Sequence, residues 1–177
     1  MNPILLGNLI SLFGSVLMVG VGFLKHKRQI LAAQCVQFAI QGAAHLILGA
    51  TAGFVSAITG IARNIAMARH GRSVPIKVFF IALQAVLSLP AMSLHPITWL
   101  PLISGGVYTW FLDLQNPIAL KAMMLGVQAV WIVYDFAYRN YVGMTFDIFA
   151  VLSTGVGLML VVRDHLPRPA RKRKRAD

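Results

Sequence analysis

Residues 3–28 read PILLGNLISLFGSVLMVGVGFLKHKR. Residues 3–24 are an apolar run without a charged residue, and the four basic residues 25–28 follow it. A helix of about 20 apolar residues is long enough to cross the hydrocarbon core of a bilayer. The uninterrupted length of the run and the lack of a basic segment before it are unlike a cleaved signal peptide. We therefore predict a transmembrane helix that remains in the mature protein, with its basic end in the cytoplasm.

The composition of the whole chain is that of a membrane protein. Of its 177 residues, 58% are hydrophobic and 12% are charged, and 16 Lys and Arg stand against 5 acids. A soluble domain carries about 25% charged residues. These values exclude an ordinary soluble domain, and the lipid bilayer is the first expected partner.

Residues that could carry chemistry are few. The five acids are all aspartates, and the single cysteine, Cys35, can neither form an internal disulfide nor complete a Cys/His metal site. No Ser/His/Asp triad, metal cluster or glycine-rich phosphate loop stands in a loop long enough to hold one. We therefore expect no enzyme activity, no metal and no cofactor.

The same length rule divides the rest of the chain into spans. Apolar runs cover residues 3–24, 29–48, 53–68, 75–94, 97–112, 118–137 and 141–162, with a small uncharged link at residues 49–53. The predicted fold is therefore all-α, a polytopic bundle of seven transmembrane helices. Six spans are the alternative, if the short fifth run or the polar third run lies partly in the membrane interface.

The positions of the basic residues predict the orientation, because Lys and Arg are retained on the cytoplasmic side. With seven spans, fourteen of the sixteen Lys and Arg residues fall on the side of the C-terminus. We therefore expect the N-terminus outside and the C-terminus in the cytoplasm. The basic tail, residues 163–177, contains the run from Arg171 to Arg175, which is expected to lie on anionic lipid headgroups rather than on nucleic acid.

The two halves of the chain resemble each other at a nearly constant offset. At a shift of 90 residues His45 aligns with Asp135, and at a shift of 93 residues 9–11 align with residues 102–104, both reading LIS. A duplicated half changes the predicted fold, so such periods are sought before local motifs. The offset predicts an internal repeat.

We predict that residues 1–72 and 97–162 are two copies of one three-helix unit. Three crossings leave the chain on the far side, so a second copy in the same orientation needs one additional crossing. The span 75–94 supplies that crossing as a linker helix. This three-plus-one-plus-three arrangement is typical of transporters with parallel repeats, in which two bundles face each other about an axis along the membrane normal.

Strings in both halves resemble one known family. Residues 45–53 (HLILGATAG), followed by Arg63 and Asn64, and residues 131–136 (WIVYDF) resemble the YgjV family of bacterial inner membrane proteins. The resemblance extends from the first span to about Arg163 and implies the bacterial cytoplasmic membrane. The three-helix halves of that family are similar in outline to the PQ-loop, SWEET and nicotinamide riboside carriers, so the resemblance implies a small-solute transporter by analogy of fold.

Polar, ionisable and aromatic residues inside the predicted spans are the candidate site residues, because a charge in hydrocarbon costs about 2.5–3.5 kcal/mol. The candidates are Asp147, Trp131, Asp135, Gln41, His45, Arg63 and Asn64. Asp135 and Asp147 are expected to face one shallow cavity from adjacent helices, where Asp147 could take up a proton. Trp131 suits stacking on a sugar ring or a nucleobase.

The charged candidates also have purely structural interpretations. Arg63 could extend to the cytoplasmic interface beside Asn64, or it could face the bundle interior and contact an anionic group or an aspartate. Asp135 could pair with Arg139, four residues later, in the headgroup region. These alternatives differ in whether the charge faces a cavity or the membrane surface.

The uncharged candidates separate two functions. Gln34, Gln37 and Gln41 recur at spacings of three and four, so they share one helical face. Either this stripe and His45 tie helices together by hydrogen bonds, or they line a polar path. The first alternative gives a membrane scaffold or accessory subunit without transport. The second, our leading hypothesis, gives a carrier of a small polar solute, and a homo-oligomer is compatible with both.

Overall fold

The computed structural model describes residues 2–21, 27–70, 73–92, 95–112, 114 and 116–165. Within these residues the chain is all-α, as predicted, with seven α-helices and two short 3-10 helices. They are α1 (Pro3–Val21), α2 (Lys27–Ile47), α3 (Thr51–His70), α4 (Val74–Ser88), η1 (Leu89–Ala91), η2 (Pro96–Trp99), α5 (Leu100–Phe111), α6 (Pro117–Ala137) and α7 (Tyr141–His165).

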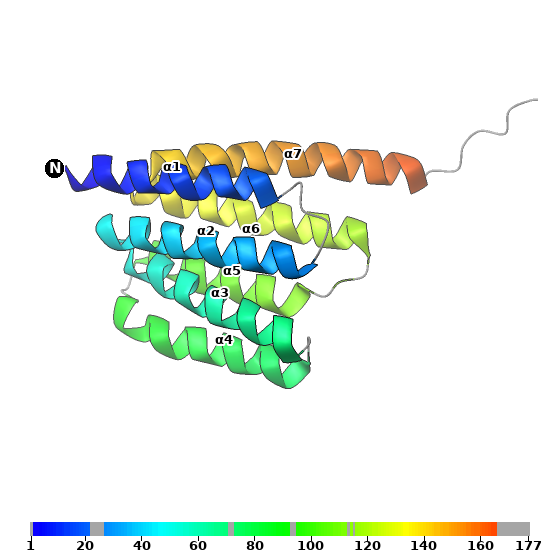
Figure 1. Ribbon diagram of the computed structural model, residues 1–177, viewed down its shortest axis with the longest axis horizontal. Coiled ribbons are helices and arrows are strands. Elements are labelled where there is room, and N and C mark those ends of the chain that lie inside the picture. Colours follow the sequence, from blue (N-terminus) through cyan, green and yellow to red (C-terminus); the bar gives the residue numbers. More distant parts are fainter. Residues whose placement is uncertain are drawn as a thin grey trace, which may run out of the picture.

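The helices lie side by side along the long axis of the molecule (Figure 1), and the contacts between them join six of the helices into a ring. Helix α1 packs against α2 and α7, α2 against α3, α3 against α5, α5 against α6, and α6 against α7. Helix α4 packs against α3 and α5 at the edge of the bundle (Figure 1). The first three helices and the last three are therefore two neighbouring groups that meet along α3–α5 and α1–α7.

Proline and asparagine define where several helices begin. Pro3 and Pro117 are the first residues of α1 and α6, and Pro75 is the second residue of α4. Proline suits the first turn of a helix, because its missing N–H would have no partner there. Asn116 precedes α6, and its side chain accepts hydrogen bonds from the first free backbone N–H groups of the helix, the nearer at 2.9 Å.

The surface of the bundle is apolar, whereas much of its interior is polar. Leu5, Phe13 and Met159 expose 63%, 63% and 65% of their surface, while Asn64 and Asn140 are completely buried. In water this distribution would expose a very large apolar area. In a bilayer it is favourable, because the apolar side chains face acyl chains and the polar groups bond to one another.

Length and composition agree with this interpretation. In the part of the chain that the structure describes, three helical stretches are long and apolar enough to cross a membrane, namely 74–91, 118–137 and 141–159, and a shorter apolar helix covers residues 3–17. The protein is therefore a polytopic helical membrane protein.

Two tight turns, between α2 and α3 and between α6 and α7, share one geometry. Gly49 and Arg139 have φ angles of 74° and 59°, the left-handed conformation that ends many helices. The next residue then donates its N–H to the carbonyl five positions earlier, at 2.8 Å in the first turn and 2.9 Å in the second. The link predicted over residues 49–53 was too long, because one left-handed glycine ends α2 and α3 begins at Thr51.

Parts of two basic segments lie outside the described residues. These are residues 22–26, which include Lys25, and residues 166–177, which include the run Arg171 to Arg175. The boundary predicted at residue 163 falls inside α7, because this helix continues to His165.

Candidate solute-binding cavity

A cavity of about 770 Å³ lies among α2, α3, α5, α6 and α7. Its lining includes six of the seven candidate residues, namely Asp147, Trp131, Asp135, Gln41, His45 and Arg63. The seventh, Asn64, is completely buried and bonds to the Arg63 guanidinium. The ring of helices thus brings together side chains from both halves of the sequence.

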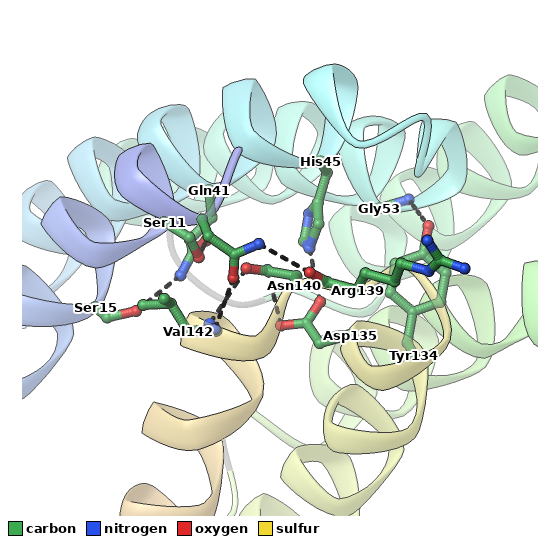
Figure 2. Close-up of polar contacts among 12 residues, drawn as sticks. Ser11, Ser15, Gln41, His45, Gly53, Tyr134, Asp135, Arg139, Asn140 and Val142 are labelled. Carbon is green, nitrogen blue, oxygen red and sulfur yellow. Dashed lines mark hydrogen bonds and ion pairs between the residues drawn. The ribbon is translucent and has the colours of Figure 1, made fainter. Parts of the chain in front are cut away.

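The glutamine stripe of α2 faces this cavity. Gln34, Gln37 and Gln41 all contribute to its lining. Gln41 also bonds to two serines of α1. The hydroxyl of Ser11 donates to Gln41 Oε1 at 2.7 Å, and Gln41 Nε2 donates to Ser15 Oγ at 3.3 Å (Figure 2). Gln41 therefore both lines the cavity and ties α1 to α2.

At the end of the bundle that holds the two turns, called the turn end below, His45 of α2 pairs with Asp135 of α6 (Figure 2). The distance from His45 Nε2 to Asp135 Oδ1 is 2.9 Å, and both side chains are buried. Asn140 Nδ2 donates to Asp135 Oδ2 at 3.1 Å. The alternative pair of Asp135 with Arg139 is not formed in the described residues, because Arg139 lies in the turn and no longer continues the face of α6.

The ring of His45 contacts Asp135 and the rings of Trp131 and Tyr134. It stacks on Trp131, with ring centroids 5.7 Å apart and an interplanar angle of 12°. Within the described residues its Nδ1 atom is buried without a hydrogen-bond partner. The tautomer with the proton on Nε2 therefore fits best, because it donates to Asp135 and leaves no buried N–H unpaired.

Tyr134 is a buried residue of this end that the sequence analysis missed. It is completely buried, and its hydroxyl accepts a hydrogen bond from the Gly53 N–H at 2.7 Å (Figure 2). Gly53 stands in the first turn of α3, where backbone N–H groups have no partner within the helix. A Cβ atom at Gly53 would lie 2.8 Å from Tyr134 Cε1 and 2.9 Å from His45 Nδ1, so only glycine fits.

Arg63 lies toward the opposite end of the cavity and is only 4% exposed. Its Nη1 donates to Thr109 Oγ1 of α5 at 2.9 Å, and its Nε and Nη2 donate to Asn64 Oδ1 at 3.3 and 3.2 Å. The guanidinium also lies over the ring of Tyr108, 4.9 Å from its centroid. Arg63 therefore faces the bundle interior and does not extend to the membrane interface.

Asp147 of α7 is half-buried and lines the cavity. Across the described part of the chain, its carboxylate makes no hydrogen bond or ion pair, in contrast to Asp135. A carboxyl group in this position is free to bind a proton or a donor group of a ligand.

The sequence analysis also missed the residues by which α4 is attached. Gln84 is 3% exposed, and its Nε2 donates to Ser56 Oγ of α3 at 3.1 Å and to the Pro101 carbonyl of α5 at 2.9 Å. Lys77 Nζ donates to the Trp110 carbonyl at 3.0 Å, near the C-terminus of α5. The signal was present, since Lys77 and Gln84 interrupt a mostly apolar run.

Comparison with known proteins gives one match. The family model Imp-YgjV, described as bacterial inner membrane protein, matches residues 5–165. No curated protein and no solved structure matches the chain.

Proposed function

Because the chain belongs to the Imp-YgjV family of bacterial inner membrane proteins, we propose that it moves a small polar solute across that membrane. The observation that supports this most directly is the cavity, whose volume of about 770 Å³ falls within the range of about 300–1,000 Å³ typical of small-ligand sites. Polar and ionisable groups inside a membrane are costly, and they commonly mark solute or ion pathways. The glutamine stripe, Arg63 and the two aspartates of the lining are such groups.

The proposal includes two copies of one three-helix unit. Helices α2 and α6 end, and helices α3 and α7 begin, at positions 90 residues apart. The two turns between them share the left-handed residue and the same backbone hydrogen bond. A two-fold rotation that exchanges α1 with α5, α2 with α6 and α3 with α7 preserves the order of neighbours in the ring. These features support the duplication, with α4 as the additional crossing.

This architecture gives seven spans, with the N-terminus outside and the C-terminus in the cytoplasm. Lys121, Arg69 and Arg163 stand near the beginning of α6 and the ends of α3 and α7, so all three lie at the end opposite the turn end. The retention of basic residues in the cytoplasm then places the turn end outside.

Alternating access requires contacts between the units to break at one end and to form at the other. At the turn end, Asn8 of α1 donates to the carbonyl of Arg139 at 2.8 Å and accepts from the Val142 N–H at 2.9 Å. The pair of His45 with Asp135 joins the same two units. In the proposed cycle these bonds close the turn end and must break for that end to open.

Two lining residues are given specific roles. Trp131 forms an aromatic wall on which a ring of the solute can stack. Asp147 takes up a proton or a donor group of the solute, because it lines the cavity without a partner among the described residues. Neither role is needed for the helices to pack.

The experiment combines binding with flux. Purified protein is screened against sugars, nucleosides and amino acids by thermal unfolding, because a ligand of the folded state must raise Tm. Uptake of each hit is then measured in proteoliposomes for the wild type, Asp147→Asn and Trp131→Ala. We expect both variants to insert normally and to lose most of the flux.

The control for this experiment is Phe136→Ala, which truncates an aromatic side chain that is 63% exposed on the same helix as Trp131. It should keep wild-type flux. Loss of insertion together with flux in the cavity variants would instead assign these residues to folding.

A non-transporting scaffold is the second candidate, and the observation that favours it is the extent of interhelical bonding. Gln41, His45 and Asp135 all bond to residues of other helices or turns, which is also what helix association requires. The absence of any hit from the ligand screen would favour this second function.

A further inference from the structure

The structure also indicates which chemical group the cavity recognises. Resting on the proposed carrier function, we infer that Arg63 is an oxyanion-binding residue and that the solute carries a carboxylate or a phosphate group. The evidence lies in the hydrogen bonds, the charge balance and the rigidity of the Arg63 site.

The first argument is the hydrogen-bond inventory of the guanidinium. An arginine side chain has five N–H groups and no acceptor. Three of them are used by Asn64 and Thr109, so two remain without an acceptor among the described residues. Because Arg63 is 4% exposed and lines the cavity, a group inside the cavity is the available partner for these donors. Two N–H groups of one guanidinium match the two oxygens of a carboxylate or phosphate.

The second argument is charge. All bonded partners of Arg63 are neutral, and of the two acids in the cavity lining, Asp135 is already hydrogen-bonded to His45 and Asn140. The remaining acid of the lining, Asp147, is the seventh residue of α7, whereas Arg63 is the thirteenth residue of α3. Both helices begin at the turn end, so the difference of six residues separates the backbone positions of Arg63 and Asp147 by about 9 Å along the bundle axis.

A buried cation without a counter-charge is expensive, and buried charges are normally paired. The ring of Tyr108 beneath the guanidinium offsets part of this cost. An anionic ligand would offset the remaining cost of burying the Arg63 charge. The charge of the ligand would itself be paired with Arg63.

The third argument is that the guanidinium is already fixed in place. Thr109 holds Nη1 from α5, and Asn64 holds Nε and Nη2. Asn64 is itself held, because its Nδ2 donates to Gln34 Oε1 of α2 at 3.2 Å. A donor group fixed by three helices binds its ligand with little loss of side-chain entropy.

The surroundings also favour an anion. The chain carries a formal net charge of +11. A large net positive charge raises the local concentration of anions around a protein.

The test uses matched pairs of anionic and neutral compounds: glutarate and glutaramide, glucose 6-phosphate and glucose, and uridine monophosphate and uridine. Thermal unfolding of the purified full chain is recorded with each compound for the wild type, Arg63→Gln, Arg63→Lys and the control Arg69→Gln. We expect an anionic member, and not its neutral partner, to raise the Tm of the wild type. Arg63→Gln should raise the Kd of that compound at least about tenfold.

The remaining variants keep the test informative even if Arg63→Gln does not fold. Arg63→Lys keeps the charge but loses the planar fork, so it should bind the anion more weakly than the wild type. Arg69→Gln removes an exposed arginine of the same helix and should bind like the wild type. Equal stabilisation by neutral and anionic partners, or unchanged anion affinity in Arg63→Lys, would overturn the inference.

A second set of samples distinguishes a soluble anion from a lipid phosphate. The same variants are placed in nanodiscs of phosphatidylcholine, with or without phosphatidylglycerol. Stabilisation by phosphatidylglycerol alone, dependent on Arg63, would support the oxyanion site but count against the carrier. Flux of a neutral solute that is unaffected by Arg63→Lys would support the carrier and overturn the oxyanion site. The two proposals can therefore fail separately.

Discussion

At the scale of single residues, glycine decides how closely the two units approach at the turn end. Gly53 brings the backbone of α3 to the hydroxyl of Tyr134, which accepts its N–H at 2.7 Å. The neighbouring ring of His45 is fixed by Asp135 and Trp131, so it cannot move aside without losing its own contacts. The contact of the Tyr134 side chain of α6 with the backbone of α3 therefore depends on a missing side chain at Gly53.

We predict that Gly53→Ala lowers the stability of the folded protein by about 1–3 kcal/mol, the usual cost of inserting a methyl group into a filled site. The measurement is thermal unfolding in detergent. The matched control is Gly126→Ala, in the interior of α6, where an added Cβ meets nothing within 4 Å. Alanine there should leave stability unchanged or raise it slightly, because alanine is the better helix former. Equal effects of the two substitutions would contradict this account of Gly53.

At the scale of elements, α4 is attached to the ring by two buried polar side chains as well as by apolar packing. Phe79 and Val86 expose 59% and 62% of their surface, whereas Phe80, Gln84 and Lys77 are buried. Gln84 bonds to two helices that belong to different units. Helix α4 can thus serve as the additional crossing and also hold α3 and α5 together.

We predict that Gln84→Leu destabilises the protein by about 1–3 kcal/mol, because it leaves the Pro101 carbonyl and the Ser56 hydroxyl without this donor. Thermal unfolding of the purified protein provides the measurement. Val86→Leu, at a position of α4 that is 62% exposed, is the control and should behave like the wild type. A Gln84→Leu protein as stable as the wild type would show that apolar packing alone holds α4.

At the scale of the whole molecule, the exposed apolar surface and the buried polar groups suit a bilayer, and the order of the helices is the one expected of the proposed two-unit carrier. With an odd number of crossings the two ends of the chain lie on opposite sides of the membrane. With an even number they lie on the same side. The number of spans is therefore testable without a structure.

We predict opposite accessibility of the two termini. In a Cys35→Ser background, a cysteine introduced by Asn2→Cys should react with a membrane-impermeant maleimide in spheroplasts, whereas one introduced by Asp177→Cys should react only after lysis. The control is the wild type, which keeps Cys35. This cysteine is partly buried inside α2, so the wild type should react slowly in both conditions. Labelling of both termini from the same side would contradict seven spans.

Much of the fold follows from the sequence, because each helix is specified locally. The runs of apolar residues predict the seven helices, with bounds that agree to within six residues. The helix boundaries that were missed are local too: the link after α2 is shorter than predicted because Gly49 alone provides the left-handed residue of the turn.

The candidate residues could also be selected from the sequence, since a polar side chain in an apolar run stands out on composition alone. The partners of these residues could not be predicted from the sequence. The sequence offered Arg139 as a partner of Asp135, and only the ring of helices, in which α2 and α6 both line the cavity, brings His45, 90 residues away, to 2.9 Å. The same holds for Tyr134 with Gly53 and for Gln84 with Pro101.

The sequence by itself determined that this chain lies in a membrane, that it forms seven helices, and which side chains are too polar to face lipid. Only the tertiary structure decided that these side chains meet around one cavity, that Arg63 faces it without a carboxylate partner among the described residues, and that Asp135 pairs with His45. The physical reason is the distance along the chain over which each effect acts. Hydrophobic length and helix termination act over a few neighbouring residues, whereas the pairing of polar groups depends on which helices become neighbours.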